Sequence, residues 1–315
     1  MVKLEKDSII LVTGSKGLVG NSLIRNLRFG GFKNILAPTR EELDLRDQKK
    51  VEEYFKNNRI DCVFHLAAKV AGFKVKEKAP ADFFYDNLLV SVNTINSANN
   101  NNVRNLLFVG SACIYSVEAE QPLRENSLFS GALEGNNEGY ALAKIAGLKL
   151  CEYFKRQNGR DYFGIVPCNL YGPNDHFDDK GHFIPKMIRK IHDAKEGNLG
   201  SIRIDGSGRA IREFLFVDDL SDAMIYFMKH KNKNDLMPFL NIGSGKEISI
   251  SEVLSEIREV IGFMGEIKFM DSEEKTVSRR LLDTSRANSL GWKVKIGLKK
   301  GLKITYDWFL KNKAY

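Results

Sequence analysis

Two side chains whose types and spacing suit proton transfer, Tyr140 and Lys144, are the centre around which the sequence is best understood. If the segment from Gly139 to Lys144 opens a helix, residues four apart share one face, so the phenol and the ammonium lie one turn apart. An ammonium stabilises a phenolate and lowers the pKa of the phenol from its ordinary value of about 10. The spacing therefore predicts a proton donor tuned by a lysine, although the same spacing also occurs on solvated helix faces.

A hydroxyl and a thiol follow a short apolar segment, in the sequence Gly110-Ser111-Ala112-Cys113. If the extended conformation of residues 106–109 persists beyond Gly110, alternate residues project to one side, and Ser111 and Cys113 share a face. A serine hydroxyl can hydrogen-bond a carbonyl oxygen, and a thiol can exchange a proton when its surroundings lower its pKa. The segment predicts polar chemistry at the end of a strand.

A glycine turn lies between an apolar strand at 8–12 and a helical pattern that runs through Leu27, with the spacing Gly14-x-x-Gly17-x-x-Gly20. In this context a dinucleotide pyrophosphate rests on the amides of the helix N-terminus.

Two cations accompany this turn, Lys16 within it and Arg40 after a second predicted strand at 34–38. A carboxylate at the position of Arg40 would bind the ribose 2′-hydroxyl of NAD, whereas an arginine accommodates a 2′-phosphate. The pair favours NADP over NAD; the alternative is two surface cations.

The elements that position these residues alternate between strand and helix. Short apolar segments separated by helical patterns predict five strands, at 8–12, 34–38, 62–66, 106–109 and 162–166. Such alternation predicts an α/β fold with a doubly wound parallel sheet, whose ligands bind at the carboxyl ends of the strands.

The alternation loosens after residue 168, which predicts two domains. We expect an NADP-binding Rossmann domain at 1–168, rejoined by about 214–243. A smaller α/β substrate-binding lobe is expected to comprise residues 169–213 and 244–315.

Composition narrows the class of protein. The 315 residues carry a net charge of +8, but the lysines are spread along the chain without a dense basic tract, which favours an anionic small ligand over nucleic acid. The four cysteines have no CxxC or metal-site spacing and are predicted to be reduced thiols, so no metal is expected. The absence of a long apolar run or a signal-peptide pattern predicts a cytoplasmic protein without a membrane span.

Several longer stretches resemble one family, the extended short-chain dehydrogenase/reductases that act on nucleotide sugars, and within it the GDP-L-fucose synthase-like epimerase/reductases for GDP-4-keto-6-deoxymannose. The resemblance covers nearly the whole chain and is carried by residues 67–72, 80–83, 106–115, 140–152, 169–174 and 212–219. It implies a GDP-sugar substrate, NADP(H) as cofactor and a homodimer. The helices around 81–99 and 140–156 are then expected to form the dimer interface.

The resemblance implies a role for each catalytic residue. Tyr140 would give its proton to the C4 oxygen of the substrate while hydride reaches C4, Lys144 would tune Tyr140 and hold the nicotinamide ribose, and Ser111 would bind the same oxygen. A C4 ketone makes the protons at C3 and C5 acidic, so an acid and a base beside the ring can epimerise both carbons. Cys113 and His182 match the family's positions for that pair.

The resemblance also implies two binding sets. The expected cofactor-binding residues are Gly14, Lys16, Gly17, Leu18, Val19, Gly20, Arg40, Asp44, Leu45, Leu66, Ala67, Ala68, Tyr140, Lys144, Pro167, Asn169, Leu170 and His182. The expected substrate-binding residues are Ser111, Cys113, Asn169, His182, Lys190, Arg212 and Arg280.

The sequence departs from the family's pattern where the substrate is expected to bind. The changed positions are Ser116, Lys190, Asp205 and Val277-Ser278. They make a larger GDP-4-keto sugar such as a heptose a plausible substrate. A C4 reductase without epimerase activity is the second interpretation, and a non-catalytic NADP-sensing module is a distant third.

Overall fold

The computed structural model describes residues 4–70, 78–178, 181–230, 238–270 and 277–312. Its larger part is built on a parallel sheet in the order β10-β5-β4-β3-β1-β2. The strands of this sheet are β1 (Ile10–Thr13), β2 (Ile35–Leu36), β3 (Cys62–His65), β4 (Asn105–Val109), β5 (Asp161–Pro167) and β10 (Phe239–Ile242). The predicted doubly wound α/β fold is confirmed.

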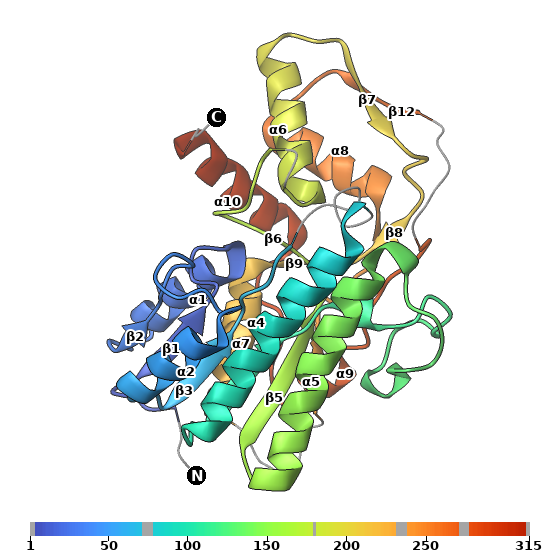
Figure 1. Ribbon diagram of the computed structural model, residues 1–315. Helices are drawn as coiled ribbons and strands as arrows, with labels where there is room; N and C mark the ends of the chain where they lie inside the picture. The colour runs from blue at the N-terminus through green and yellow to red at the C-terminus, as the bar shows by residue number, and fades with distance from the viewer. Residues whose placement is uncertain (1–3, 71–77, 179–180, 231–237, 271–276, 313–315) are drawn as a thin grey trace.

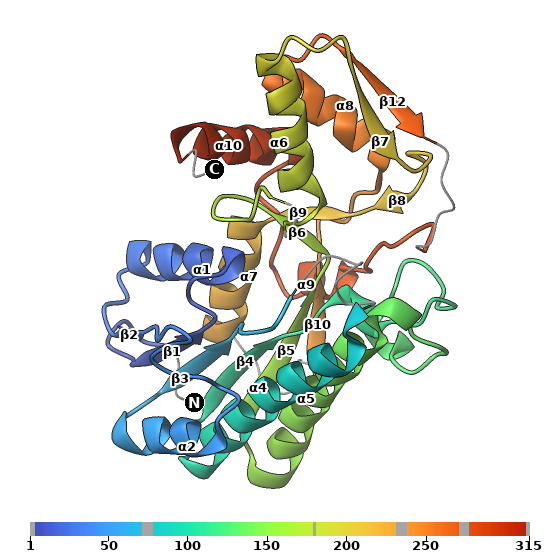
Figure 2. The same cartoon turned by 45° about the horizontal axis from the view of Figure 1, so that its top comes forward.

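Helices cover both faces of this sheet (Figures 1 and 2). One face carries three helices that pack in a row, α2 (Gln48–Asn57), α4 (Pro80–Asn100) and α5 (Glu138–Asn158). The other face carries α1 (Leu18–Phe29) and α7 (Val217–Lys229), which pack against each other. Because both faces are covered, every residue of β1, β3 and β4 is buried, as expected for parallel strands with continuous apolar sequences.

The smaller lobe lies beyond the carboxyl ends of these strands (Figure 2). Its helices are α6 (Phe183–Glu196), α8 (Ile250–Ile261) and α10 (Leu298–Lys311). Its strands form pairs: β6 (Asn169–Tyr171) with β9 (Phe214–Phe216), β7 (Ser201–Asp205) with β12 (Glu266–Met270), and β8 (Ile211–Arg212) with β11 (Ile248–Ser249).

Each part has its own hydrophobic core. One core surrounds the six-stranded sheet, and the other joins α6, α8 and α10, with Ile188, Leu254 and Leu302 at or below 1% exposure. The chain crosses between them more than once: β10 pairs with β5, and Leu282 and Trp292 pack in the first core together with α9 (Ser285–Ser289). The smaller lobe is thus held to the sheet by several passes of the chain.

One local prediction is wrong. The strand conformation does not persist past Gly110, because β4 ends at Val109 and Ser111 becomes the N-cap of a 3₁₀ turn over Ala112–Ile114. The hydroxyl of Ser111 accepts a hydrogen bond from the amide of Cys113. Serine is a favoured capping residue, and this bond gives the amide of Cys113 the acceptor that a neighbouring strand would otherwise provide. Ser111 and Cys113 therefore adjoin through a turn, not through strand alternation.

Candidate active site

The glycine turn after β1 is a close-packed backbone cradle. Gly14 has φ of +70°, in the left-handed region, and a Cβ built on it would lie 2.8 Å from the amide nitrogen of Ala67. A Cβ on Gly20 would lie 2.2 Å from the carbonyl oxygen of Gly14. A side chain at Gly14 would therefore collide with the backbone after β3, and one at Gly20 would collide with the turn itself. Leu18 and Val19 form the first turn of α1, directly after the glycine turn. The cradle therefore fits the pyrophosphate of a dinucleotide.

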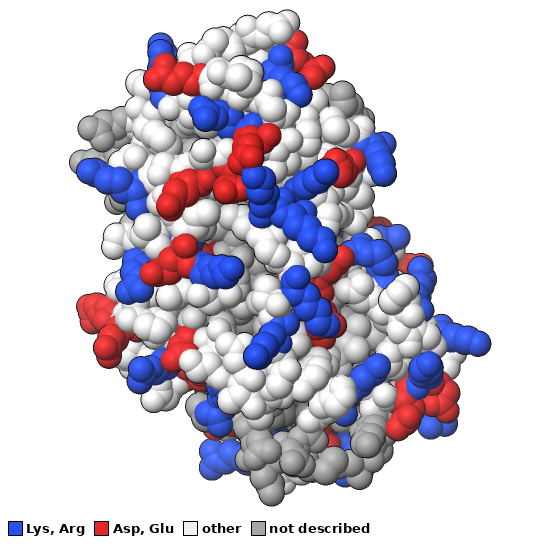
Figure 3. Space-filling view, turned by 180° about the vertical axis from the view of Figure 1, so that it is seen from behind, with Lys and Arg blue, Asp and Glu red and all other residues white. Residues whose placement is uncertain are grey.

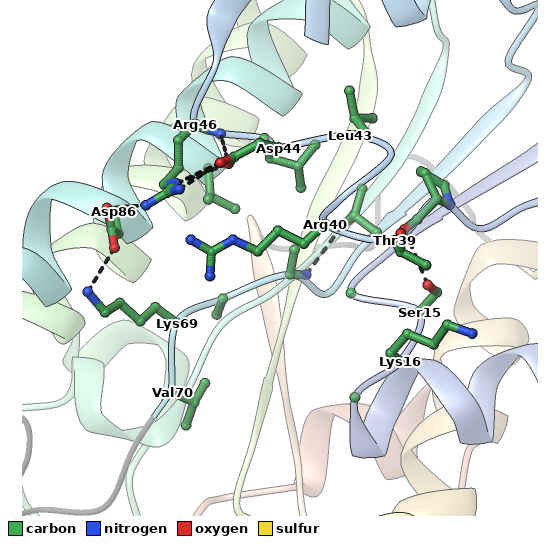
Figure 4. A pocket seen from close by; sticks show the side chains of 18 residues that line it. Ser15, Lys16, Thr39, Arg40, Leu43, Asp44, Arg46, Lys69, Val70 and Asp86 are labelled. Carbon is green, nitrogen blue, oxygen red and sulfur yellow. Dashed lines mark hydrogen bonds and ion pairs between the residues drawn. The ribbon is translucent and has the colours of Figure 1, made fainter. Parts of the chain in front are cut away.

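A cavity of about 410 Å³ adjoins this turn (Figure 4). It lies beside the carboxyl ends of β1, β2 and β3. Its lining includes the predicted cofactor residues Gly14, Lys16, Gly17, Arg40, Asp44, Leu45, Ala67 and Ala68. In Figure 4 the guanidinium of Arg40 extends into the cavity, and no dashed line joins it to the residues drawn. Its dimensions and cationic side chains suit the adenosine half of a phosphorylated dinucleotide.

A row of four alternating charges forms one wall of this cavity (Figure 4). Arg46 grips both carboxylate oxygens of Asp44, with Nη2 at 2.6 Å from Oδ2 and Nε at 3.0 Å from Oδ1, and its Nη1 lies 3.4 Å from Asp86. Lys69 Nζ donates to the other oxygen of Asp86 at 2.8 Å. The hydrogen bond from Arg46 lowers the pKa of Asp44 to about 2, so Asp44 is ionised at neutral pH.

Buried polar groups fix the backbone that closes the cavity. The hydroxyl of Thr13 accepts from the amides of Leu66 and Ala67 at 3.1 and 3.3 Å, and lies 2.8 Å from Nδ1 of His65. Burial lowers the pKa of His65 to about 3, so its imidazole is neutral and orders the core.

Tyr140, Lys144 and Cys113 meet in one buried site beside the end of β4. Cys113, Tyr140 and Ala141 form a small cluster with Ala68 packed against it. Lys144 Nζ lies 5.8 Å from the centre of the Tyr140 ring and donates to the carbonyl oxygen of Val109 at 2.7 Å. The predicted tyrosine-lysine pair is therefore present on α5. The turn that Ser111 caps, directly after β4, packs against this helix.

The electrostatics of this pair differ from the simple expectation. Burial raises the pKa of the Tyr140 phenol, and a charge on Cys113 raises it further. Burial also lowers the pKa of Lys144 to about 8. Desolvation is the main cause of both pKa shifts because both groups are almost fully withdrawn from water, with Tyr140 8% and Lys144 3% exposed.

His182 belongs to the second lobe, as the N-cap of α6. Its Nδ1 lies 3.1 and 3.2 Å from the two carboxylate oxygens of Asp175. The side chain of Asp175 is 3% exposed and that of His182 is 52% exposed. A buried carboxylate thus fixes one ring nitrogen, which leaves Nε2 as the nitrogen able to exchange a proton.

The residues predicted to bind substrate surround the junction between the lobes. Asn169 donates to the carbonyl oxygen of Glu213 at 3.0 Å, and Arg212 donates to the carbonyl oxygen of Ile211 at 2.8 Å. Arg280 pairs with Glu134, with Nη2 3.3 Å from Oε2.

The remaining predicted residues lie nearby or on the second lobe. Pro167 ends β5, and Leu170 lies in the middle of β6. Lys190 instead reaches β7, where it donates to the carbonyl oxygen of Arg203 at 2.6 Å. The structure therefore gives Lys190 a contact within its own lobe.

Sequence reasoning missed four charged residues that hold the site together: Arg46, Asp86, Glu134 and Asp175. Arg46 and Asp86 are forty positions apart, and Glu134 and Arg280 more than a hundred, so no local pattern connects them. Asp175 had a weaker signal, an aspartate seven positions before a candidate histidine. The departure positions 277–278 were noted in the sequence, but their predicted place in the pocket stays a prediction.

The described residues contain no group of three or more metal-binding side chains, and no helix among them is long and apolar enough to span a membrane. All four cysteines are buried, and they are thiols that form no disulfide with one another.

Comparison with known proteins places this site in a family. The chain belongs to the NAD dependent epimerase/dehydratase family, whose model matches residues 10–243. Within it, the chain is 42% identical to GDP-L-fucose synthase of Escherichia coli K12 over 310 residues, which cover 96% of this chain and 97% of that protein. The resemblance to GDP-L-fucose synthase-like extended reductases is confirmed.

Two solved structures from Campylobacter jejuni are also similar. One is a GDP-6-OMe-4-keto-L-xylo-heptose reductase, with a TM-score of 0.93 and 36% identity, covering 98% of this chain and 99% of that one. The other is a GDP-mannoheptose C4 reductase with NADP bound, with a TM-score of 0.91 and 37% identity over the same shares of the two chains.

Proposed function

We propose that this protein is an NADPH-dependent epimerase/reductase. Its substrate is a GDP-4-keto-deoxy sugar, either GDP-4-keto-6-deoxymannose or a related GDP-4-keto heptose, and it combines C3/C5 epimerisation with reduction of the C4 ketone. The observation that carries this proposal is the buried meeting of Tyr140, Lys144 and Cys113 beside the strand end at Ser111. The names of the similar proteins supply the substrate class.

The residues of the cavity fit NADPH, which supplies the hydride chemistry when bound. The amides of the glycine turn would hold its pyrophosphate, and Lys16 and Arg40 its 2′-phosphate. The proposed cofactor domain is 1–168 with 214–243. It leaves residues 169–213 and 244–315 as the substrate lobe, with 282–292 packing back onto the sheet.

Tyr140 is the proposed proton donor to the C4 oxygen. Burial raises the pKa of Tyr140, so the phenol keeps its proton at neutral pH, and it would release that proton only as negative charge develops on the C4 oxygen. Lys144 stands one turn away, where its ammonium stabilises the phenolate left after transfer and can hold a ribose hydroxyl. Ser111 would bind the same C4 oxygen and share the negative charge that develops on it.

Cys113 and His182 are the proposed acid and base for C3 and C5. Removing a proton from a carbon beside the C4 ketone gives an enolate, and returning the proton from the opposite face inverts that carbon. Asp175 orients the imidazole of His182 for one of these transfers. No cofactor turnover is needed for the exchange, which makes it separable from reduction.

The substrate's diphosphate suits the guanidinium groups at the lobe junction. Arg212 and Arg280 would bind it, and Asn169 would hydrogen-bond the sugar. The ammonium of Lys190 contacts β7 and would have to leave Arg203 to reach the diphosphate.

A reductase without epimerase activity is the second candidate. Two observations favour it: similar structures are named as C4 reductases, and the His182 side chain is half exposed.

Isotope exchange separates the two functions. The protein is incubated with GDP-4-keto-6-deoxymannose in deuterated water without NADPH, and the sugar is analysed by NMR. The epimerase/reductase predicts deuterium at C3 and C5. No deuterium, with reduction intact once NADPH is added, would leave only the reductase. If the protein shows no exchange and no reduction with either hexose or heptose substrates, the proposal is overturned.

We further propose that the protein is a cytoplasmic homodimer. The outer faces of α4 and α5 carry exposed apolar side chains, with Phe84 37%, Tyr85 63%, Leu142 42% and Tyr153 48% exposed. A second copy packing its own α4 and α5 there would bury them. Four buried cysteines that form no disulfide with one another suit a reducing compartment. Sedimentation equilibrium of the wild type and of Tyr85→Glu tests this proposal. We expect a dimeric wild type and a monomeric variant, and a monomeric wild type would overturn the proposal.

The surface charge does not suggest a further partner. Figure 3 shows one face of the molecule, on which Lys and Arg side chains are interspersed with Asp and Glu. We therefore propose no nucleic-acid partner.

A further inference from the structure

We propose that Arg46 is a specificity-determining residue, which makes the cavity prefer a dinucleotide with a 2′-phosphate by neutralising Asp44. This inference rests on the proposed NADPH-dependent function. It assigns to Arg46 a role toward the cofactor that does not require direct contact with it. Its basis is the arrangement of charges around the cavity in Figure 4.

The cavity lining is not uniformly basic. It holds four cations and two anions: Lys16, Arg40, Arg46, Lys69, Asp44 and Asp86. Four of these form the row Asp44-Arg46-Asp86-Lys69, in which each neighbouring pair has opposite charge and contacts at 2.6, 3.4 and 2.8 Å. The row as a whole is neutral. Lys16 and Arg40 are the lining cations outside it.

Asp44 is the anion that matters most for a 2′-phosphate. Asp44 and Arg40 line the same cavity, and after the larger effect of the Arg46 hydrogen bond the charge of Arg40 also lowers the pKa of Asp44. Arg46 is the dominant influence on that carboxylate, because it binds both oxygens and donates its own amide to Oδ1 at 3.1 Å. Asp44 is therefore ionised, but Arg46 binds both of its carboxylate oxygens. The guanidinium of Arg40 extends into the cavity instead of pairing with Asp44.

Removal of the Arg46 charge changes this balance in two ways. Asp44 becomes an uncompensated anion that repels a 2′-phosphate, which itself carries a charge of about −1.5 to −2. Asp44 also becomes a partner for Arg40 and draws the guanidinium away from the phosphate. A ribose 2′-hydroxyl suffers neither penalty, because a free carboxylate can accept its hydrogen bond. Removal of the Arg46 charge should therefore weaken the binding of NADPH but not the binding of NADH.

The test measures dissociation constants for NADPH and NADH, by quenching of protein fluorescence, in the wild type and in variants. Arg46→Gln should lower the preference for NADPH over NADH by about tenfold, which corresponds to about 1.4 kcal/mol. Arg46→Lys keeps the charge and should keep most of the preference. The ratio is the readout because both dinucleotides share the adenine and the pyrophosphate, so a general loss of binding cancels.

Two further variants isolate the mechanism. The double variant Arg46→Gln with Asp44→Asn should restore the preference, because the uncompensated anion is gone. Arg59→Gln removes one positive charge from a side chain that is 82% exposed and paired with Asp61 at 3.4 Å, and should leave the ratio unchanged. The effect of Arg46→Gln should shrink in about 1 M salt, where charges are screened over about 3 Å.

The outcomes separate this inference from the proposed function. If the wild type binds NADPH no better than NADH, the cofactor assignment fails, and the inference with it. If the wild type prefers NADPH but Arg46→Gln weakens both dinucleotides by the same factor, only the inference is overturned. Failure of Asp44→Asn to restore the preference also overturns it. Should Arg46→Gln not fold, Asp44→Asn alone decides: a tenfold loss of preference in that variant contradicts the proposal.

Discussion

Replacement of Lys144 by methionine should change how stability depends on pH. Lys144 is 3% exposed, its ammonium donates to the carbonyl oxygen of Val109, and it lies 4.8 Å from the centre of the Phe108 ring. Burial lowers its pKa from 10.5 to about 8. The folded protein therefore holds this proton less tightly than the unfolded chain, and the free energy of unfolding is reduced wherever the unfolded chain remains protonated.

The magnitude follows from the size of this shift. Each pKa unit corresponds to about 1.4 kcal/mol, so the charged Lys144 costs about 3 kcal/mol of stability below pH 8. As pH rises from 8 toward 10.5 the unfolded state still binds the proton while the folded state has lost it, so the cost is relieved. Stability due to this group thus increases with pH. Methionine fills a similar volume without a charge and removes this pH dependence.

The assay is urea unfolding at pH 7, 8, 9 and 10 of the wild type and of Lys144→Met. The difference in free energy of unfolding, variant minus wild type, should decrease by about 2 to 3 kcal/mol between pH 7 and pH 10. Lys303→Met, at an exposed position of α10, controls for the loss of one positive charge from the protein. A difference that is constant between pH 7 and pH 10 would refute the argument that burial has displaced the pKa of Lys144.

Three further predictions concern the proposed site. Tyr140→Phe removes the proton donor and should lower kcat by about a thousandfold or more while NADPH binding, followed by fluorescence, is kept; turnover close to that of the wild type would remove Tyr140 from its role. Gly20→Ala places a Cβ 2.2 Å from the carbonyl oxygen of Gly14 and should weaken NADPH binding at least tenfold and lower the melting temperature, whereas Gly135→Ala, where a Cβ would have open space, should change neither. Asp175→Asn should slow deuterium exchange into the sugar by about tenfold or more, with an altered pH profile and with C4 reduction retained, and equal loss of both activities would show that Asp175 has only a structural role.

The sheet and its glycine turn could be predicted because their signals are local. A buried parallel strand requires a continuous apolar segment such as 8–12. The tight approach of α1 to the turn after β1 requires glycine at position 20, and the close approach of the backbone after β3 requires glycine at position 14. The pair Tyr140 and Lys144 is likewise a matter of helix periodicity. Each of these features is encoded within about ten residues.

Contacts between distant segments could not be predicted in this way. The row from Asp44 to Lys69 joins a loop, a second loop and helix α4, and nothing in the sequence near Arg46 indicates that Asp86 will face it. The error at Ser111 is different, because the deciding feature is local: a serine that follows a strand can cap a turn, and strand alternation alone does not reveal this. The pKa of Tyr140 depends on burial by the whole fold, which no spacing reports.

The proposed reaction can be measured by supplying purified protein and NADPH with GDP-4-keto-6-deoxymannose and, separately, with a GDP-4-keto heptose, while following NADPH oxidation and identifying the products by NMR. We expect NADPH oxidation with at least one of these ketosugars and a product reduced at C4, with C3 and C5 inverted. Absence of NADPH oxidation with both, from a protein that binds NADPH, would contradict it.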